Sequence, residues 1–224
     1  MIMLELANNS ISEIPEEIFQ LTGLRVLNFA HNRISSISPS IGKLTRLQSF
    51  LMSYNPLSGS GIPEEIAQIG TISEISLCGT GLTEIPGPIF SLPMIATLSL
   101  ANCQISQIPT KIRTLSSLTK LHLTANKLTK LDDSLCELFN MKEMDLAHNM
   151  ITEVSRNVSR LTCIFDLDLS GNKIQNLPSE IMQCGCLAQL KVGYNQLNEL
   201  PKLVAGNHVW ISHQGLKTRN FVGK

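Results

Sequence analysis

The sequence predicts an α/β solenoid, a curved stack of short units with a parallel β-sheet on its concave side and short helical or 3₁₀ turns on its convex side. Three observations predict this fold class: an aliphatic pattern that returns at a constant spacing, an Asn that closes each strand segment, and a Pro that follows at a fixed distance. Hydrophobic residues make up 43% of the 224 residues but aromatic residues only 4%. This composition favours many similar thin layers over one large irregular core.

The aliphatic pattern covers almost the whole chain. Its first copy consists of Leu4, Leu6, Asn9, Ile11, Ile14, Pro15, Ile18 and Leu21. Nine units run from Met1 to about Leu203, and they start near residues 1, 24, 47, 72, 95, 118, 141, 164 and 187. A constant period of this kind is the sequence signature of a repeat architecture, in which neighbouring units bury one another's apolar surface.

The first part of each unit predicts a β-strand. In the segment 118–126, Leu121 and Leu123 alternate with polar residues, as a half-buried strand requires. Strands this short are not stable alone, so the copies are expected to pair into a parallel sheet.

An Asn closes the strand segment in seven of the nine units. Its amide is both a donor and an acceptor, and buried backbone polar groups must be paired. We therefore expect a structural ladder of side-chain amides between successive turns. Thr80 and Cys103 take this position in the other two units and are expected to weaken the ladder there. The ladder consists of Asn9, Asn32, Asn55, Asn126, Asn149, Asn172 and Asn195.

The segment that begins Pro15-Glu16-Glu17 predicts the convex turn. Pro suits a first helical position because its missing N–H would have no partner there, and acidic residues suit the positive end of a helical turn. Asp132 and Ser155 replace Pro in units six and seven, so the turn is expected to differ in detail there. Pro86, Pro109, Pro178 and Pro201 repeat this Pro in later units.

These residues resemble the leucine-rich repeat family, specifically its 23-residue Leu-Pro-x-x-Ile-x-x-Leu subclass of Ras-associated and plant intracellular proteins. Unit three departs from the subclass, because the segment Asn55 to Pro63 contains two extra residues. Its Leu57-Ser-Gly and Ile62-Pro63 look like plant extracellular repeats, although a Gly and Ser insertion in a surface loop also explains them. The resemblance implies a non-enzymatic module that binds a partner protein on its concave surface.

Both ends of the repeat array lead to expectations. The chain starts inside a strand pattern at Met1, so we expect the first strand edge to be covered by further sequence or by a second molecule through self-association. Residues 204–224 are expected to form a C-terminal cap and a frayed tail. The strand pattern fails in a tenth unit counted from Trp210, so no tenth strand is expected, and the segment 209–211 is expected to pack over unit nine.

Several function classes are disfavoured by the sequence. The 18 Lys and Arg residues balance 18 Asp and Glu residues, which disfavours a nucleic-acid partner. No apolar stretch is long enough to cross a membrane, so no membrane insertion is expected. Motifs of phosphate loops, serine hydrolases, zinc proteases and kinases are missing, and Cys184-Gly185-Cys186 has no second pair of zinc ligands. We expect no catalysis, no cofactor and no metal.

The expected concave surface has four carboxylates in units seven and eight, which we call the acidic surface. Parallel strands lie about 5 Å apart, so these groups repel one another unless positive groups are near. Three interpretations follow: a solvated face with cross-strand ion pairs, a site for a basic partner, or a calcium site, which is the least favoured because rigid strands seldom surround an ion. The acidic surface is Glu143, Asp145, Asp166 and Asp168, and its flanking residues are Lys120, His122 and Lys191.

Units three to five supply a second candidate surface that is nearly neutral. Leu51 is expected to be the one large exposed apolar side chain of the concave floor, with Tyr54 beside it.

The leading functional expectation is an intracellular signalling scaffold in the cytoplasm. Two alternatives stay open. In the first, the chain is the recognition arm of a larger enzyme, such as a kinase, a GTPase or a ubiquitin ligase. In the second, it is an extracellular receptor ectodomain, which intact glycans or disulfides would establish.

The six cysteines generate a first prediction. Their density is too low for a disulfide framework, so all six thiols are expected to be reduced in the native protein. Thiol titration in denaturant, without reductant and after anaerobic handling, should count six. A count of four or fewer would contradict the cytoplasmic location.

Overall fold

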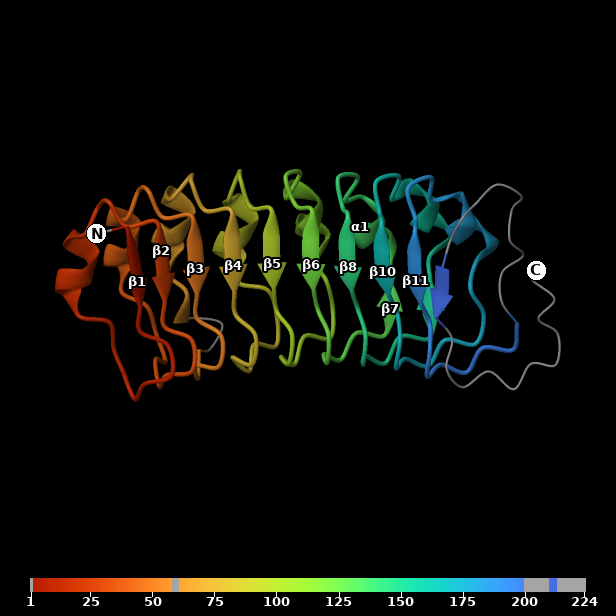
Figure 1. The fold of residues 1–224 in the computed structure, drawn as a ribbon, viewed down its shortest axis with the longest axis horizontal. Coiled ribbons are helices and arrows are strands. Elements are labelled where there is room, and N and C mark those ends of the chain that lie inside the picture. The colour runs from red at the N-terminus through yellow and green to blue at the C-terminus, as the bar shows by residue number, and fades with distance from the viewer. Residues whose placement is uncertain (1, 58–60, 200–209, 213–224) are drawn as a thin grey trace.

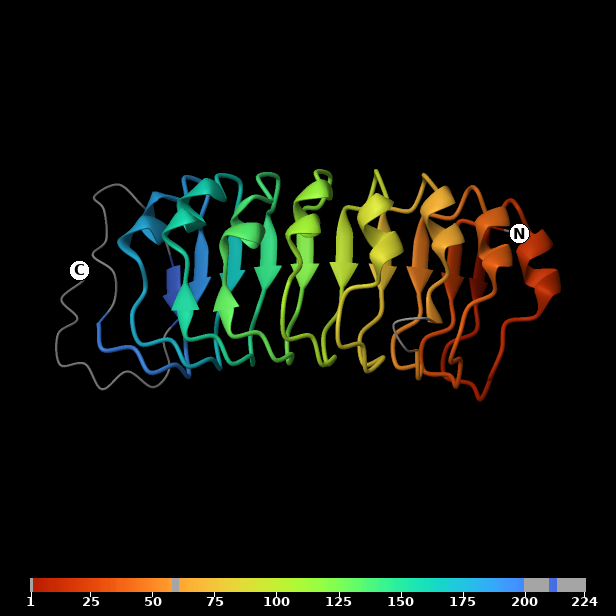
Figure 2. The ribbon, with the colours of Figure 1, turned by 180° about the vertical axis from the view of Figure 1, so that it is seen from behind.

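The computed structural model describes residues 2–57, 61–199 and 210–212. The units follow one another along an elongated stack, with the strands side by side on one face (Figure 1). The short helical turns lie behind this sheet (Figure 2). The parallel sheet confirms the expected solenoid fold class.

Ten strands of three residues each form the main sheet, and every neighbouring pair is parallel. The register repeats the period of the sequence, since Met3 pairs with Val26, and Ser49 pairs with Glu74 across the longer third unit. The strands are β1 (Met3–Glu5), β2 (Val26–Asn28), β3 (Ser49–Leu51), β4 (Glu74–Ser76), β5 (Thr97–Ser99), β6 (Lys120–His122), β8 (Glu143–Asp145), β10 (Asp166–Asp168), β11 (Gln189–Lys191) and β12 (Trp210–Ser212).

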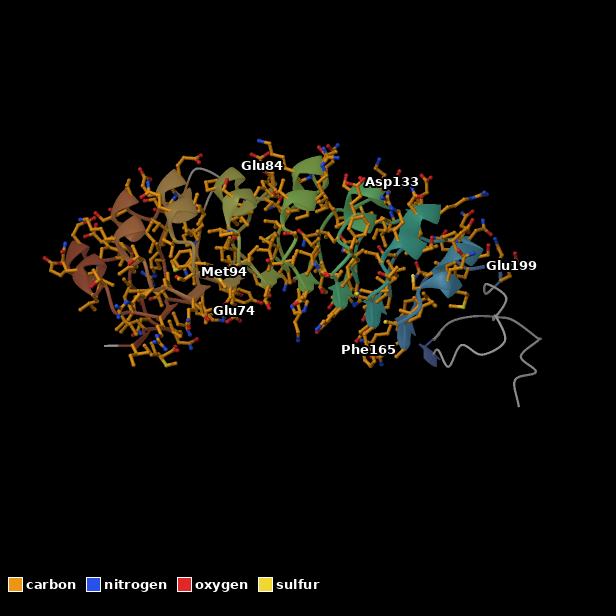
Figure 3. All side chains as sticks on the ribbon, turned by 90° about the horizontal axis from the view of Figure 1, so that it is seen from above. Glu74, Glu84, Met94, Asp133, Phe165 and Glu199 are labelled. Atoms are coloured by element: carbon orange, nitrogen blue, oxygen red, sulfur yellow. The ribbon has the colours of Figure 1, made fainter. Side chains whose placement is uncertain are left out.

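In the main sheet, the central residue of each strand from β2 to β11 is buried, and its two neighbours point to the concave surface. Leu121 is fully buried in β6, as its alternation with polar residues predicted. Figure 3 shows the two sides of this layer: Glu74 and Phe165 lie on the strand side, whereas Glu84 and Asp133 lie on the side of the turns.

The asparagine ladder connects successive units as predicted. Asn149 Nδ2 donates to the carbonyl of Leu123 in the preceding unit at 2.9 Å and to the carbonyl of Leu146 in its own unit at 3.0 Å. Its Oδ1 accepts the N–H of Leu128, also in the preceding unit, at 3.0 Å. One amide therefore satisfies backbone groups of two turns at once. Asn32, Asn55, Asn126, Asn172 and Asn195 make the equivalent bonds.

Thr80 and Cys103 replace this amide with one donor each. Thr80 Oγ1 lies 2.7 Å from the carbonyl of Leu77, and Cys103 Sγ lies 3.4 Å from the same oxygen. Neither side chain has an amide's second donor, so the ladder is thinner in units four and five, as the sequence indicated.

The convex side consists mainly of 3₁₀ turns, which confirms the expected turn type. In five of these turns, Pro15, Pro63, Pro86, Pro109 and Pro178 immediately precede the first helical residue instead of occupying it. The turns are η1 (Glu16–Gln20), η2 (Pro39–Lys43), η4 (Glu64–Gln68), η5 (Gly87–Ser91), η6 (Thr110–Thr114), η7 (Arg156–Arg160) and η8 (Ser179–Gln183).

Units six and seven differ from this scheme, as the loss of Pro suggested. β7 (Lys130–Leu131) and β9 (Glu153–Val154) pair in parallel on the convex side, and α1 (Asp133–Cys136) replaces a 3₁₀ turn. The N–H of Ser155 donates to the carbonyl of Leu131 at 2.8 Å. A Pro has no N–H for this bond, so the substitution permits the second, two-stranded sheet.

The expectation of no tenth strand was wrong. β12 pairs in parallel with β11, with Trp210 opposite Gln189 and Ile211 opposite Leu190. A repeat of 23 residues, as in most of the other units, would place Ser212 opposite Gln189. The tenth strand begins two residues earlier than this repeat predicts. The rest of the proposed cap and tail lies outside the described residues, as does Pro201.

Loss of a ladder amide should destabilise the protein strongly. We expect Asn149→Ala to lower the free energy of unfolding by about 1–3 kcal/mol, because buried backbone groups lose their partners. The matched control is Asn9→Ala, because Asn9 is exposed and donates to carbonyls of its own turn, those of Leu6 and Ala7. This control should change stability by no more than about 0.5 kcal/mol. Urea unfolding measures both, and equal shifts would contradict the role of the ladder.

Candidate partner-binding surface on the concave sheet

Four neighbouring strands bring the predicted acidic surface and its flanking residues together. The order β6, β8, β10 and β11 is continuous in the sheet. The register aligns them in two rows across these strands. One row is Lys120, Glu143, Asp166 and Gln189, and the other is His122, Asp145, Asp168 and Lys191.

Glu143 is held by two residues of β6. Lys120 Nζ lies 3.0 Å from Glu143 Oε2, and His122 Nε2 lies 3.1 Å from Glu143 Oε1. A carboxylate oxygen only accepts, so His122 Nε2 is the protonated nitrogen, and Nδ1 faces Ser99 Oγ at 3.2 Å. The hydrogen bond from Lys120 is the largest influence on Glu143; burial opposes it and His122 supports it, and the net result is a lowered pKa.

Lys191 forms a second pair on the other side of the acidic surface. Its Nζ lies 2.9 Å from Asp166 Oδ2 and 3.8 Å from Asp168 Oδ2. Burial opposes the charged form of Lys191, but the hydrogen bond to Asp166 and the neighbouring carboxylates outweigh it and raise its pKa. Lys191 is therefore a fixed cation at neutral pH.

Asp145 and Asp168 also support the backbone at the ends of their strands. Asp145 Oδ1 accepts the N–H of Ala147 at 3.0 Å, and Asp168 Oδ1 accepts the N–H of Ser170 at 2.9 Å. Asn28 Oδ1 accepts from Ala30 in the same way in unit two. An amide can thus replace the carboxylate at this position and keep the turn bond.

The acidic surface stays negative after these contacts. Among the described residues, its four carboxylates have two lysines as ion-pair partners, Lys120 and Lys191, so two net negative charges are left when His122 is neutral. Within the described residues, Asp166 Oδ1 is buried and accepts no hydrogen bond. The Lys120–Glu143 pair is exposed, and an exposed ion pair contributes only about 0.2–1 kcal/mol. The cluster is therefore better explained by the electrostatic field it creates than by stability.

Leu51 and Tyr54 are not part of this cluster. Leu51 lies on β3, which β4 and β5 separate from β6. It is half-buried, so the expectation of a large exposed side chain was wrong, because Asn28 and Ser76 flank it on the neighbouring strands. Tyr54 is exposed, and its ring stacks on His31 with ring centroids 4.3 Å apart.

The sequence reasoning missed a row of residues directly beyond the strand ends. The eighth residue of every unit has a positive φ, from Asn8 at 59° to Tyr194 at 55°. Rings in this row lie over neighbouring glycines: a Cβ on Gly79 would be 2.5 Å from the Tyr54 ring, and one on Gly171 would be 2.6 Å from the ring of His148. The glycines at the eighth position of units four and eight, Gly79 and Gly171, are the feature of the sequence that could have indicated a positive φ at this position.

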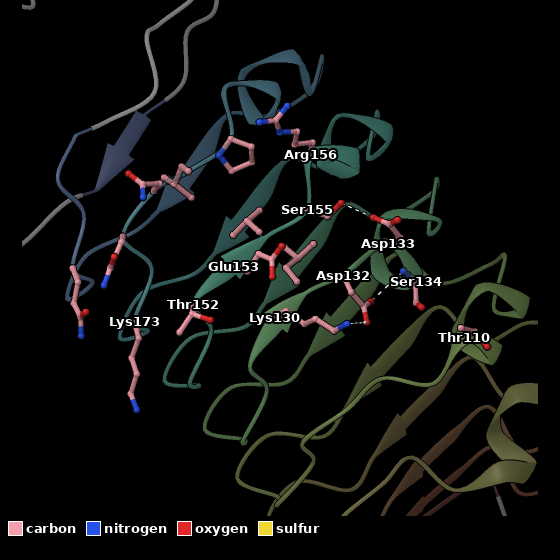
Figure 4. A pocket seen from close by; sticks show the side chains of 17 residues that line it. Thr110, Lys130, Asp132, Asp133, Ser134, Thr152, Glu153, Ser155, Arg156 and Lys173 are labelled. Atoms are coloured by element: carbon pink, nitrogen blue, oxygen red, sulfur yellow. Dashed lines mark hydrogen bonds and ion pairs between the residues drawn. The ribbon is translucent and has the colours of Figure 1, made fainter.

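A polar groove lies on the opposite, convex side over units six to eight. It encloses about 1120 Å³ beside β7 and β9, and Lys130, Glu153 and Lys173 are among its lining residues (Figure 4). Ser155 donates to Asp133 there, which is the main cause of the lowered pKa of the Asp133 carboxyl. Apart from the missing prolines, no feature of the sequence indicated this groove.

The described ranges contain neither a metal cluster nor a membrane span. No three or more His, Cys, Asp or Glu side chains there are arranged so that they could bind a metal ion. In the same part of the chain, no helix has both the length and the apolar character needed to span a bilayer.

Comparison with known families agrees with the repeat geometry. The leucine-rich repeat profile matches residues 3–57 and 116–174, just over half of the chain. The protein belongs to the leucine-rich repeat family. Domains of this family generally bind protein partners and are typically not enzymes. A sequence search against curated proteins finds no match.

Solved structures with the same fold come from several organisms. A leucine-rich repeat protein of Leptospira interrogans is 29% identical with a TM-score of 0.85, over 90% of this chain and 51% of that one. The ectodomain of the Arabidopsis receptor kinase HAESA, in complex with a peptide hormone, is 28% identical with a TM-score of 0.70, over 87% and 34%. An internalin of Listeria monocytogenes is 20% identical with a TM-score of 0.72, over 96% and 68%. The chain thus spans about half of the Leptospira structure.

The Glu143 contacts generate a pKa prediction. Lys120→Met should raise the pKa of Glu143 towards its ordinary value, because the largest stabilising contact of the carboxylate is lost. The pair contributes stability above that ordinary pKa, and the contribution is lost as the pH falls through the lowered pKa. NMR titration of the carboxyl carbon measures the shift. Lys127→Met is the control, because Lys127 bonds to Gln104 at 3.1 Å. An unchanged pKa in Lys120→Met would exclude this ion pair.

Proposed function

We propose that the chain is a protein-interaction module that binds a basic segment of a partner on the concave surface of units six to nine. The observation that supports this most is the net negative charge of the acidic surface after its internal ion pairs are counted. Clefts and concave surfaces of one charge concentrate field lines and steer oppositely charged partners.

The ion pairs within the acidic surface indicate which charges a partner segment must carry. Asp145 faces neither lysine within ion-pair distance among the described contacts, whereas Glu143 and Asp166 are each paired. The side chains of Glu143 and Lys120 are 39% and 51% exposed, so their pair can open to a competing cation at little cost. A partner with two or more lysines or arginines along an extended segment fits this spacing of about 5 Å between strands.

The cellular location that we propose follows from the resemblance of the repeats to an intracellular type. We place the module in the cytoplasm as a signalling scaffold, following the Ras-associated and plant intracellular type of repeat. The recognition arm of a larger kinase, GTPase or ubiquitin ligase stays the main alternative, and the partial coverage of the Leptospira structure is compatible with it.

A receptor ectodomain is the second alternative, and one comparison favours it. The HAESA ectodomain, 28% identical over 87% of this chain, was solved with a peptide hormone ligand. The exposed Asn157 in Asn157-Val158-Ser159 would carry a glycan in such a protein. Intact-mass measurement of the native protein distinguishes the two settings, because a glycosylated Asn157 would overturn the cytoplasmic location.

The decisive variant neutralises the acidic surface without breaking its turns. Asp145→Asn combined with Asp168→Asn removes two charges and keeps both Oδ1 acceptors, as Asn28 does in unit two. We expect roughly tenfold slower association with the native partner and a weaker dependence on salt, because steering is lost. Partner capture from native extract, followed by stopped-flow kinetics, measures both.

The control for this experiment removes the same charge elsewhere. Glu13→Gln combined with Glu84→Gln changes two exposed residues at equivalent positions outside the strands. It should associate like the unmodified chain. If the double Asn variant also associates normally at low salt, the acidic surface is a solvated face, and the Leu51 and Tyr54 region becomes the site to test.

A further inference from the structure

Two cysteines occupy the same position in consecutive units. Cys163 is the last residue of unit seven, and Cys186 is the last residue of unit eight. β10 begins three residues after Cys163, and β11 begins three residues after Cys186. Cys186 is exposed and Cys163 is partly exposed, so both thiols are accessible to a small reagent from the same edge of the sheet.

The two cysteines lie in turns that share one backbone hydrogen bond. Around Cys163, the N–H of Ile164 donates to the carbonyl of Leu161 at 3.2 Å; around Cys186, the N–H of Leu187 donates to the carbonyl of Cys184 at 3.1 Å. β10 and β11 pair in register directly after these turns. The Cα atoms of the two cysteines are therefore separated by about one strand spacing, roughly 4.7–4.9 Å, which is within the range of disulfides.

Side chains at this last position reach back to the preceding unit. Thr71 Oγ1 donates to the carbonyls of Thr45 and Leu47 at 3.1 and 2.6 Å, which flank the equivalent residue of the preceding unit. Ser117 Oγ donates to the carbonyl of Pro93 at 2.8 Å. The γ oxygen of the last residue in these units thus lies close to the last residue of the preceding unit.

A Cys186 side chain that takes the direction of Thr71 and Ser117 reaches towards Cys163. A rotation of Cys163 about its Cα–Cβ bond then turns its thiol towards Cys186. In-register copies have Cβ atoms about 4.8 Å apart, whereas a disulfide needs about 3.8 Å, so the turns must approach by about 1 Å. Both residues lie in turns outside the strands, two residues before the first backbone bonds that join the units there, from Phe165 to Lys142 and from Ala188 to Phe165.

We propose that Cys163 and Cys186 form an inter-repeat disulfide when the reduced protein meets a peroxide. The Cys186 thiolate attacks one peroxide oxygen, the O–O bond breaks, and a sulfenic acid and water form after protonation. The Cys163 thiol then attacks the sulfenic sulfur, and a second water leaves with the proton. The two thiols lose two electrons in total, and the peroxide gains them.

The buried cysteines provide internal controls. Burial raises the pKa of Cys136 to about 12 and that of Cys184 to about 11, so little of either thiol ionises at neutral pH. Because the thiolate is the nucleophile, these two residues should stay reduced under the same treatment. Cys103 is also buried, as a member of the ladder position.

The bridge would connect the turn that enters β10 with the turn that enters β11. These strands present Asp166, Asp168 and Lys191, so oxidation fixes the lateral spacing of half of the acidic surface. The chemistry itself is independent of whether that surface binds a partner.

Peptide mapping of the whole chain tests the proposal directly. The reduced protein is treated with hydrogen peroxide, its remaining thiols are alkylated, and trypsin is added without reductant. Peptide 161–173 should appear joined to peptide 174–191, lighter than their sum by two hydrogen atoms. Fragmentation of the pair should assign the bond to Cys186 and leave an alkylated Cys184. Thermal melting should show a higher transition temperature for the oxidised protein.

Two variants make the result unambiguous. Cys186→Ser should abolish the joined peptide and the shift in melting temperature, whereas Cys78→Ser, at a partly exposed cysteine far along the stack, should keep both. The proposal is overturned if peroxide gives only sulfenic or sulfinic acid at Cys186, an intermolecular dimer, or a bond to Cys184. Circular dichroism of each variant before oxidation confirms that it is folded.

Discussion

The asparagine amide at the ninth position makes the stack continuous. Each strand contributes only three residues to the sheet, so the sheet alone leaves long turns whose backbone groups point into the core. Asn149 resolves this by donating to Leu123 and Leu146 and accepting from Leu128, three groups in two units. The same contact recurs in units two, three and six to nine, where it ties each unit to its predecessor, as expected for a solenoid with nearest-neighbour contacts.

The regular placement of strands decides what the concave surface can present. Side chains at the third and fifth positions must form rows at strand spacing, so like charges in successive units become neighbours. Glu143 contacts Lys120, its neighbour in the same row, and Asp166 contacts Lys191, which lies on the next strand in the other row. Asp145 instead accepts the backbone N–H of Ala147 in its own unit. Recognition and architecture therefore use different positions of the same unit.

Much of the fold was predictable from the sequence, because the period fixes the buried position, the ladder position and the convex turn. The site was predictable only as rows of residues. The sequence did not predict which ion pairs form. Lys191 lies closer to Asp166 than to Asp168, and that choice depends on side-chain rotamers. The positive φ of Tyr54 and Ala125 was also hidden, since neither is a glycine. β12 was missed because a shorter connection from β11 broke the assumed period.

The pairing of β7 with β9 has a mechanical consequence. A solenoid bends because its units are farther apart on the outside than on the inside. Between units six and seven, however, hydrogen-bonded strands lie on both sides, β6 with β8 inside and β7 with β9 outside. Both separations then equal the spacing of hydrogen-bonded strands, about 4.8 Å, so the arc is locally straight there. The surface of Lys120, His122, Glu143 and Asp145 therefore lies on a locally straight part of the arc, which suits a flat or extended partner better than a rounded one.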